Sequence, residues 1–299
     1  AMTLRLGLVG AGIAHSRSPA LHAAGLTSLG RPGRYDRFEA PTEAAFVSLV
    51  SRLRSGDLDG LNVTTPWKPL AAAMCDHVFR SDESGGLSAV TAGARSPVNT
   101  LFIREGLLCG TSTDGPGLGL ALEVSDVTLD HRAIALVGSG GAGASVAHWL
   151  MSRGADLRWI SNRSSEPAER LVAALGVRRD GGDVEVVPWA RPDAMAAAEI
   201  VIHASRVGHG KEGAEAEFAA LQLQHLPWHA WATTATLVDL VYGDTPTAAQ
   251  RCAIAAGTPD TRILRHSGRS MLACQAALSL GIWTGAEAPV QAMLAALQP

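Results

Sequence analysis

The feature that most constrains the fold is the regular alternation of short apolar runs with helical stretches. The apolar runs that predict strands lie at residues 4–9, 35–39, 60–63, 133–137, 156–161, 184–187, 200–203 and 237–239. The helical stretches between them lie at residues 19–29, 42–53, 142–153 and 167–175. A strand–helix–strand rhythm builds parallel sheets covered by helices, so we expect an α/β protein with mostly parallel sheets.

The length of 299 residues suits two domains of about 100–200 residues each. Residues 113–125 are expected to connect them, beginning as a glycine-rich turn and becoming helical at about Leu118. Residues 268–297 are helical, with an interruption around 285–289, and follow the last predicted strand. Periodicity alone leaves open whether this segment packs on the second domain or returns to the first.

Composition excludes several classes of protein. Apolar residues make up 47% of the chain and charged residues 18%, which excludes a disordered chain. A net charge of −3 predicts no attraction to nucleic acid or to an anionic membrane. No apolar run is long enough to span a membrane, no secretory signal is apparent, and the four cysteines form no CxxC pair. We therefore expect a cytoplasmic protein with reduced thiols and no metal site.

Two glycine-rich loops follow predicted strands. Gly10-Ala11-Gly12 lacks the third glycine of a dinucleotide-binding turn, because His15 stands at that position. The second loop, residues 138–143, matches G-x-G-x-x-G in full and lies between a predicted strand and a predicted helix. That context allows backbone N–H groups at a helix N-terminus to bind a pyrophosphate. We expect the cofactor at the second loop, although an ordinary glycine-rich turn would look the same.

The residues after the next predicted strand indicate which dinucleotide is bound. An NAD site usually has Asp or Glu here, which binds the ribose 2′-hydroxyl. This chain has Asn162-Arg163-Ser164 instead, and a guanidinium with a hydroxyl suits a 2′-phosphate. The sequence therefore favours NADP, unless Arg163 is simply a solvated side chain at a strand end.

Lysine is scarce, because only Lys68 and Lys211 are lysines among 25 basic residues. Lys68 ends the segment Asn62–Lys68, which follows a predicted strand, and ligands of α/β sheets bind at such strand ends. An ammonium there can donate a proton or stabilise an alkoxide. Asp114 could orient a substrate hydroxyl and pair with Lys68, or it could only cap a helix.

The segment Ser16-Arg17-Ser18-Pro19 precedes a predicted helix. Two hydroxyls and free N-terminal amides form a plausible carboxylate site. The same four residues are also an ordinary helix start with Pro in the first turn. His15 and His22 are expected to be structural.

Seven motifs, in order along nearly the whole chain, resemble the shikimate dehydrogenase family. They lie at residues 15–19, 62–68, 98–100, 113–115, 138–143 and 162–163, and in a C-terminal set formed by Gly268, Met271, Leu272, Gln275 and residues 283–285. The resemblance implies reversible, NADP-linked oxidation of shikimate to 3-dehydroshikimate. It also implies that residues 1–114 with 268–299 form a substrate-binding domain, and that residues 115–267 form a Rossmann-type NADP-binding domain.

The resemblance assigns roles to individual residues. Lys68 and Asp114 would be the catalytic pair. The substrate would be bound by Ser16 and Ser18 at its carboxylate and by Thr64, Asn99, Asp114, Tyr242 and Gln275 at its ring. The cofactor would be bound by Gly138, Gly140, Gly141, Ala142, Gly143, Asn162, Arg163, Ser164, Gly268 and Met271. The partners would be small molecules only, and the protein a monomer or a homodimer.

Two alternatives to an active shikimate dehydrogenase remain open. The chain could act on quinate or an amino analogue, although Ser18, in place of the Thr that resembles quinate-using relatives, favours shikimate. It could also be a non-catalytic shikimate-binding homologue, but the retained Lys68 and Asp114 argue against this.

The chain departs from the family pattern on the cofactor side. Pro167 stands where a second cation is common in the family, whereas Arg206 follows a later strand where the family usually has Pro. We hypothesise that Arg206 approaches the cofactor and partly replaces that charge.

Overall fold

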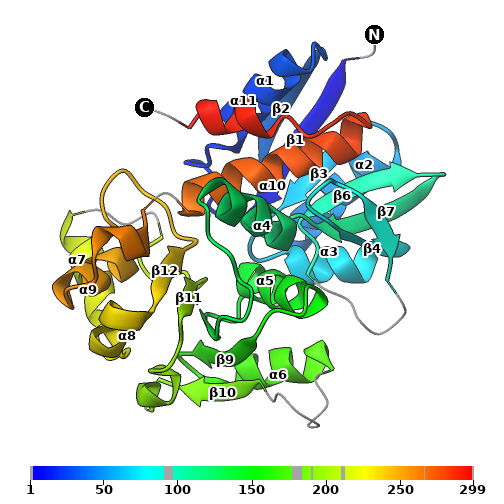
Figure 1. Ribbon diagram of the computed structural model, residues 1–299. Coiled ribbons are helices and arrows are strands. Elements are labelled where there is room, and N and C mark those ends of the chain that lie inside the picture. The colour runs from blue at the N-terminus through cyan, green and yellow to red at the C-terminus, as the bar shows by residue number, and fades with distance from the viewer. Residues whose placement is uncertain are drawn as a thin grey trace. The chain divides into compact units, whose positions relative to one another are not determined.

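The computed structural model describes residues 3–90, 97–176, 184–189, 191–209, 213–265 and 267–297. The chain forms two compact units, Ala1–Leu120 with Ser270–Pro299 and Ala121–Arg269, here called unit 1 and unit 2. Each unit has one sheet with helices packed on it, so the prediction of a two-domain α/β fold is confirmed (Figure 1).

Unit 1 is built on a seven-stranded sheet with the order β2-β1-β3-β6-β7-β4-β5. Its strands are β1 (Leu4–Gly10), β2 (Gly33–Glu39), β3 (Gly60–Val63), β4 (His77–Ser81), β5 (Leu87–Ala89), β6 (Thr100–Arg104) and β7 (Leu107–Ser112). Its helices are α1 (Ser18–Ser28), α2 (Glu43–Arg54), α3 (Lys68–Met74), α4 (Asp114–Val124), α10 (Ser267–Thr284) and α11 (Val290–Ala295), of which α4 and α10 continue into unit 2.

The sheet of unit 1 is mixed. The predicted strands β1, β2 and β3 pair in parallel, and β4 pairs in parallel with β7. The sequence indicated none of β4, β5, β6 and β7, of which β6 pairs antiparallel with β3 and β7, and β5 pairs antiparallel with β4. Because β6 and β7 form a hairpin, β7 runs in the same direction as β3. The carboxyl ends of β1, β3 and β7 and the start of β6 therefore lie at one edge of the sheet.

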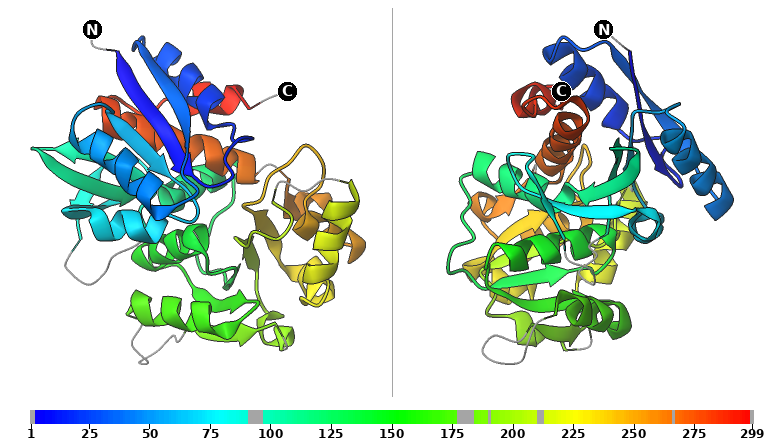
Figure 2. Two further views of the ribbon diagram at one scale, coloured as in Figure 1. Left: turned by 180° about the vertical axis from the view of Figure 1, so that it is seen from behind. Right: turned by 90° about the vertical axis from the view of Figure 1, so that its right-hand side faces the viewer.

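The C-terminal helices pack on the sheet of unit 1. The buried side chains of Leu6, Leu8 and Leu21 share a core with Ala276 of α10 and Met293 of α11. The helices α1 and α11 lie side by side in both views of Figure 2. The ring of Trp283 occupies the place of a side chain at Gly60, so only glycine fits there. The question left open by periodicity is settled, since residues 270–299 complete unit 1.

Helix α4 begins earlier than expected. The sequence predicts a glycine-rich turn that becomes helical near Leu118, but the helix starts at Asp114. Its first turn contains Pro116, whose missing N–H costs nothing there, and a carboxylate at its N-terminus interacts favourably with the helix dipole. A Cβ on Gly117 would lie 2.7 Å from the backbone nitrogen of Gln275, so glycine allows α4 and α10 to approach closely.

Unit 2 has a fully parallel six-stranded sheet with the order β10-β9-β8-β11-β12-β13. Its strands are β8 (Ile134–Val137), β9 (Leu157–Asn162), β10 (Glu185–Pro188), β11 (Ile200–His203), β12 (Thr236–Asp239) and β13 (Ile263–Leu264). Its helices are α5 (Gly141–Ser152), α6 (Ser165–Leu175), α7 (Gly213–Leu223), α8 (Trp228–Thr234) and α9 (Ala248–Ala255), with short 3-10 turns at Pro192–Met195 and Asp260–Arg262.

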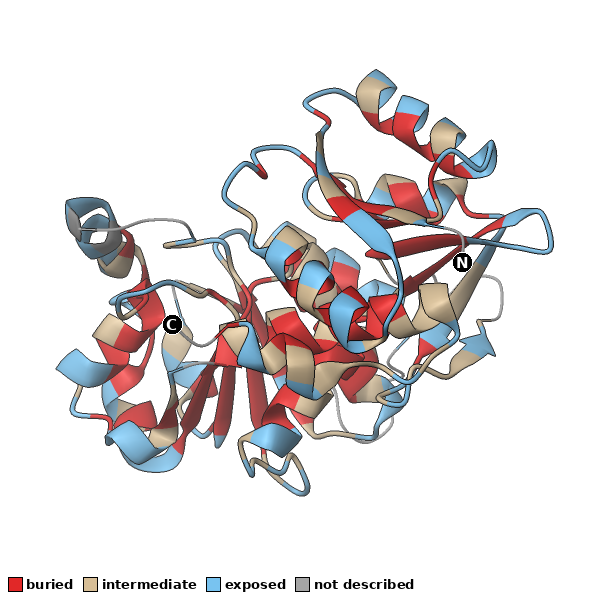
Figure 3. Cartoon of the chain, turned by 90° about the horizontal axis from the view of Figure 1, so that it is seen from above, coloured by how far each residue is buried: buried red, intermediate tan, exposed pale blue. Residues whose placement is uncertain are grey.

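Three strands of unit 2, β8, β11 and β12, are more deeply buried than its other strands. All residues of β8, β11 and β12 are buried, as the red strands of Figure 3 show. Continuous apolar runs are typical of parallel strands covered on both faces, which explains why the sequence predicted them so closely. The order places β8 between β9 and β11, and the carboxyl ends of these three strands lie at one edge of the sheet.

Candidate functional site

Three helices of unit 1 begin with residues that the sequence singled out. Ser18, Lys68 and Asp114 are the first residues of α1, α3 and α4, which follow β1, β3 and β7. Since these strands run in one direction, their helix N-termini gather at the same edge of the sheet. Ligands of α/β sheets bind at this edge.

Lys68 and Asp114 form a buried ion pair. The Nζ atom of Lys68 lies 2.5 Å from Oδ2 of Asp114, and the two residues are 8% and 6% exposed. A lysine at a helix N-terminus is disfavoured by the helix dipole, so the carboxylate stabilises the ammonium at this position. Breaking a buried pair leaves an uncompensated charge, and the two side chains therefore hold each other in place.

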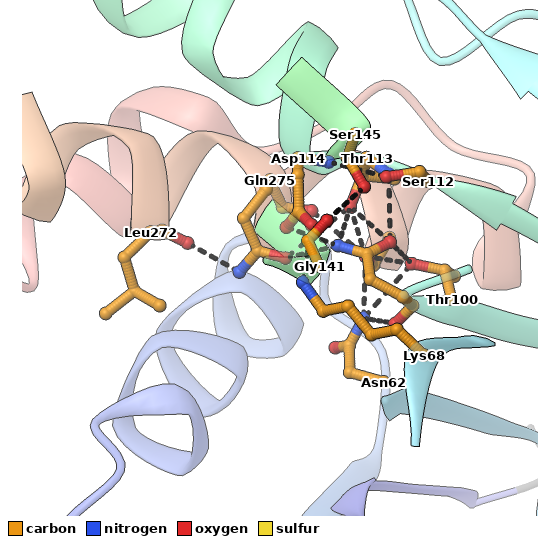
Figure 4. Close-up of polar contacts among 12 residues, drawn as sticks. Asn62, Lys68, Thr100, Ser112, Thr113, Asp114, Gly141, Ser145, Leu272 and Gln275 are labelled. Carbon is orange, nitrogen blue, oxygen red and sulfur yellow. Dashed lines mark hydrogen bonds and ion pairs between the residues drawn. The ribbon is translucent and has the colours of Figure 1, made fainter. Parts of the chain in front are cut away.

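The side-chain amides of Asn99 and Gln275 lie beside this pair. Figure 4 shows Lys68, Asp114 and Gln275 together. The side-chain amide of Asn99, which is 2% exposed, donates to Oδ1 of Asp114 at 2.9 Å and to Oε1 of Gln275 at 3.2 Å. Its oxygen accepts from the backbone N–H of Thr113 at 2.9 Å. Gln275 donates to the carbonyl of Leu272 at 2.9 Å. Both carboxylate oxygens of Asp114 thus have a fixed partner, which orients the group.

A second layer of polar side chains supports this cluster, and the sequence analysis missed most of it. The amide of Asn62 donates to Oγ of Ser279 at 2.9 Å and to Oγ1 of Thr100 at 3.1 Å. The hydroxyl of Tyr35 donates to Oδ1 of Asn62 at 2.8 Å. Ser279 lies one helical turn after Gln275, and this spacing on one helix face could have identified it.

The Ser16–Ser18 segment lies at the end of β1. Oγ of Ser16 donates to Oγ of Ser18 at 3.1 Å and accepts from the backbone N–H of Ser18 at 3.2 Å. Ser18 is buried and Ser16 is half-buried. The half-buried Thr64 lies at the end of the neighbouring β3, and its backbone N–H donates to Val9. The two hydroxyls of the predicted carboxylate site are therefore together, in the segment that leads from β1 into α1, and β1 is the neighbour of β3, which Thr64 follows.

His22 and Tyr35 are two buried aromatic residues that both contact Ser18. Their rings stack with centroids 3.8 Å apart, and Nδ1 of His22 donates to the carbonyl of Ser18 at 3.0 Å. Burial lowers the pKa of His22 to about 4, although the bond to Ser18 opposes this shift. Burial also raises the pKa of Tyr35 well above its usual value, opposed by a hydrogen bond with Ser18. Both rings are neutral at physiological pH.

In unit 2, the turn between β8 and α5 needs glycine for two different reasons. Gly138 has a φ of +111°, and a Cβ there would lie 2.5 Å from the backbone nitrogen of Ser205. A Cβ on Gly143 would overlap the carbonyl oxygen of Gly138. The fold itself requires these two glycines. A Cβ on Gly140 would instead project into open space, so the fold does not explain that glycine.

Gly140 leaves room beside the free N–H groups at the start of α5. Gly140 is the N-cap, and Gly141 and Ala142 begin the helix, whose first N–H groups have no partner within it. Oγ of Ser139 is buried and has no hydrogen-bond partner among the described residues. A dinucleotide pyrophosphate fits this turn, because its oxygens would accept from the backbone and from Ser139.

The predicted 2′-phosphate residues lie at the end of the neighbouring β9. Asn162 is the last residue of β9, and its side chain donates to the carbonyl of Ser164 at 3.1 Å. Arg163 and Ser164 follow and line a pocket of about 750 Å³. Arg206, which follows β11, lines the same pocket.

A buried network fixes the loop that carries Arg206. His203, which is 1% exposed, contacts Oδ1 of Asp239 through Nδ1 at 2.8 Å and Oγ of Ser205 through Nε2 at 2.6 Å. The other carboxylate oxygen of Asp239 accepts from the hydroxyl of Thr247. Asp239 is the last residue of β12 and was not predicted as a functional residue. A carboxylate at the end of a buried strand was a signal for it.

Comparison with known proteins agrees with this arrangement. Residues 8–90 match the family described as "Shikimate dehydrogenase substrate binding domain". Residues 268–298 match the family described as "Shikimate 5′-dehydrogenase C-terminal domain". The shikimate dehydrogenase (NADP(+)) of Bordetella petrii is 33% identical over 98% of this chain and 95% of its own length. The chain belongs to the shikimate dehydrogenase family.

Two solved structures share the fold over almost the whole chain. The enzyme of Thermus thermophilus, solved with NADP(H) and shikimate, has 31% identity and a TM-score of 0.76 and covers 98% of both chains. The quinate dehydrogenase of Corynebacterium glutamicum, solved with NAD, has 25% identity and a TM-score of 0.77 and also covers 98% of both chains.

The remaining candidate residues of this family member are distributed over both units. Met271 is buried in the part of α10 that belongs to unit 1, one turn before Gln275. Gly268 lies in unit 2, where a Cβ would come within 2.7 Å of the Val241 carbonyl oxygen, so the fold already requires this glycine. Tyr242 also lies in unit 2 and contacts the ring of His209 edge to face. The structure thus gathers Lys68, Asn99, Asp114 and Gln275 in unit 1, whereas Tyr242 belongs to unit 2.

Neither a metal cluster nor a membrane-spanning helix is present among the described residues of this family member. Within the part of the chain that the structure describes, no group of three or more His, Cys, Asp or Glu residues could hold a metal ion. None of the helices described there is long and apolar enough to cross a membrane.

Proposed function

We propose that this chain is an NADP-dependent shikimate dehydrogenase, which interconverts shikimate and 3-dehydroshikimate. The observation that carries the proposal is the buried Lys68–Asp114 ion pair with the amides of Asn99 and Gln275 around it. A proton donor, an oriented carboxylate and two amides suit a substrate that presents several ring hydroxyls. The family relationship supports the same substrate and the same cofactor.

Each polar group of unit 1 has a role in this proposal. In the direction of reduction, the ammonium of Lys68 donates a proton to the oxygen of the new hydroxyl. In the direction of oxidation, the amine accepts that proton back, and Asp114 holds the neighbouring hydroxyl. Ser16 and Ser18 bind the substrate carboxylate, while Thr64, Asn99 and Gln275 contact ring hydroxyls. Unit 1 is the substrate domain in this proposal, and Tyr242 of unit 2 adds a further ring contact.

Unit 2 is the cofactor domain in this proposal. Bound NADP⁺ supplies the hydride acceptor for the reaction. Gly138, Gly140, Gly141, Ala142 and Gly143 hold its pyrophosphate through the turn and the N-terminus of α5. Asn162, Arg163 and Ser164 bind the 2′-phosphate end, and Gly268 and Met271 lie near the nicotinamide. The open space at Gly140 supports this assignment, because the fold does not require glycine there.

A steady-state assay of the purified chain tests the proposal. Absorbance at the NADPH band is followed with shikimate and with quinate, each in the presence of NADP and of NAD. We expect turnover with shikimate and NADP to exceed that of the other three combinations. Turnover with quinate alone would replace shikimate as the substrate, and no turnover with any combination would overturn an enzymatic function. A cytoplasmic location and a monomeric or homodimeric state complete the proposal.

A further inference from the structure

A pocket of about 750 Å³ lies at the carboxyl edge of the unit 2 sheet. Arg163 and Ser164 reach it from the end of β9, Trp189 from the end of β10, and Arg206 from the end of β11. Helix α7 contributes Phe218, whose ring is 66% exposed. The lining therefore combines two guanidinium groups with two aromatic faces, which suits an aromatic base that carries a phosphorylated sugar.

The two arginines approach the pocket from opposite sides. Strands β9 and β11 flank β8, whose end continues into the glycine-rich turn. Neighbouring strands are about 4.8 Å apart, so β9 and β11 end about 10 Å from each other. An extended arginine side chain spans most of that distance. Both guanidinium groups can therefore reach one phosphate.

Neither guanidinium is used elsewhere among the described residues. Most arginines of unit 2 hold a partner, as Arg132 holds the carbonyl of Glu199 and Arg158 the carboxylate of Asp156. Within the described part of the chain, Arg163 and Arg206 form no ion pair or side-chain hydrogen bond. An arginine that is not needed by the fold and faces a pocket is available to a ligand.

The backbone beneath Arg206 is anchored even though its side chain is exposed. The preceding Ser205 contacts the buried His203, which is held by Asp239. Oγ of Ser205 also accepts from the backbone N–H of Val207 at 3.3 Å, which closes a tight turn around Arg206. A side chain on a fixed backbone loses less conformational freedom when it binds a ligand.

The sign of the local charge favours an anion. Among the described residues that line the pocket, Arg163 and Arg206 are opposed by one carboxylate, that of Glu215 on α7. The pyrophosphate of a dinucleotide is accommodated by the N-terminus of α5. The phosphate left for the arginines is therefore a separate one, and in NADP this is the 2′-phosphate of the adenosine.

We propose that Arg206 is the second guanidinium of the 2′-phosphate site and that it raises the selectivity of this chain for NADP over NAD. This inference rests on the proposed function, because it takes NADP as the cofactor. Arg163 is the primary partner of the phosphate, since Ser164 and Asn162 lie beside it. Arg206 adds a second charge from the end of β11. Pro167, near the start of α6, supplies no charge on the Arg163 side.

Calorimetric titration with NADP and NAD tests the inference on the wild type, Arg163→Ala, Arg206→Ala and the double variant. Loss of hydrogen bonds to a charged group predicts that Arg163→Ala weakens NADP binding about 10- to 150-fold. Arg206→Ala should weaken it by less, about 3- to 10-fold, because the side chain is exposed and screened. The affinity for NAD should change less than about 2-fold in all variants.

Two further measurements isolate the phosphate itself. Adenosine 2′,5′-bisphosphate and adenosine 5′-phosphate, used as probes, should reproduce the NADP and NAD results without the nicotinamide half. Glu215→Gln should strengthen NADP binding and leave NAD unchanged, which is the opposite of the arginine variants. Arg170→Ala is the matched control, because this exposed arginine pairs with Glu166 on α6 and does not line the pocket.

The outcomes separate this inference from the proposed function. A wild type that prefers NADP, together with a selective loss in Arg206→Ala, supports both. If Arg206→Ala weakens NADP and NAD equally, or weakens neither, the role of Arg206 is overturned while the proposed function stands. If the wild type binds NADP no better than NAD, the NADP part of the proposed function fails as well.

Discussion

The two glycine-rich turns of this molecule differ in what completes them. In unit 1, the backbone N–H groups of Gly12 and Ile13 donate to the carboxylate of Glu39 on the neighbouring strand β2. In unit 2, helix α5 begins directly at Gly141, and its first N–H groups remain available beside the open space at Gly140. One turn is thus completed by an anion of the chain itself, whereas the other is left for an external anion.

A glycine in such a turn indicates ligand binding only when the fold itself does not require glycine there. Gly10 is needed because Thr64 occupies the place of its side chain, and Gly12 has a φ of +70°. Both are explained by the fold of unit 1, as Gly138 and Gly143 are explained by the fold of unit 2. The informative glycine is the one that the fold does not require, which is Gly140. The predictions below test how far chemistry and cofactor binding are divided between the two units.

The largest effect is expected from Lys68→Ala. Loss of a positioned proton donor lowers turnover by about 100-fold or more. NADP affinity should be unchanged, because the residues proposed to hold its pyrophosphate and its 2′-phosphate belong to unit 2. Steady-state kinetics and calorimetry measure the two quantities on one preparation. Lys68→Arg keeps the charge beside Asp114 but cannot transfer a proton, so near-normal turnover in that variant would contradict a proton-transfer role.

The two units also differ in their buried histidines. In unit 1, Nε2 of His22 has no hydrogen-bond partner among the described residues. In unit 2, both ring nitrogens of His203 form hydrogen bonds. The pKa of His22 is lowered to about 4 in the folded state. The unfolded chain therefore binds a proton that the folded chain does not, and stability is lost as the pH falls from about 6.5 towards 4.

This loss should reach about 3 kcal/mol of the free energy of unfolding. Urea unfolding at several pH values checks it. His22→Phe retains ring stacking on Tyr35 but does not titrate, so its stability should decline less over the same interval. Parallel pH curves for wild type and variant would show that His22 is not the source.

Two glycine variants separate the fold of the unit 2 turn from its binding. Gly143→Ala places a Cβ against the Gly138 carbonyl oxygen and should lower the free energy of unfolding by about 1–3 kcal/mol. Gly140→Ala should leave stability unchanged but weaken NADP binding about 10-fold, because its Cβ would occupy the open space that the pyrophosphate is proposed to fill and displace it by about the equivalent of one charge-assisted hydrogen bond. Thermal unfolding and calorimetry give both quantities. Normal NADP affinity in a folded Gly140→Ala protein would remove this turn from the cofactor site.

Ser18→Ala should mainly weaken substrate binding. A carboxylate far from the reacting carbon is bound similarly in the ground state and the transition state, so KM rises about 10-fold while kcat changes little. Ser16→Ala should act in the same direction. Ser28→Ala, at the other end of α1, is the matched control. A large fall in kcat at constant KM would place these hydroxyls elsewhere in the mechanism.

The smallest effect is expected from Glu39→Gln. The exposed carboxylate holds two backbone N–H groups, so its loss should cost about 1 kcal/mol of stability. The stoichiometry of NADP binding should remain one per chain, because the unit 1 turn is not followed directly by a helix. Calorimetry measures the stoichiometry. A second NADP bound in the variant would contradict the distinction between the two turns.

The sequence predicted β1, β2 and β3 of unit 1 and most strands of unit 2, but it did not indicate β4, β5, β6, β7 or β13. The strands of unit 2 are continuous apolar runs, and β11 spans the predicted residues 200–203. By contrast, β4 is largely exposed and β5 has only three residues, so neither gives a clear apolar pattern. The start of α4 was misplaced because Gly115-Pro116-Gly117 is typical of a turn, although this composition is tolerated in a first helical turn.

The sequence indicated the contact between Lys68 and Asp114, but not the amide contacts around it. Scarcity and motif identified Lys68 and Asp114, which are 46 residues apart and in direct contact. The bond from Asn99 to Gln275 joins residues 176 positions apart, and no local spacing predicts it. The roles of individual residues in binding and catalysis stay predictions, and the variants above are their tests.

Unit 1 is assembled from both ends of the chain, and this has a consequence for how the protein is made. While the ribosome synthesises the chain, Leu6, Leu8 and Leu21 emerge about 250 residues before the α10 and α11 side chains that cover them. Unit 2 is continuous and can complete its core from its own residues as soon as they leave the ribosome. The first half of unit 1 must keep an apolar sheet face exposed until residues 270–299 have been synthesised. The packing of these residues is thus a late step in the folding of unit 1, and a chain truncated before Ser270 would expose that face permanently.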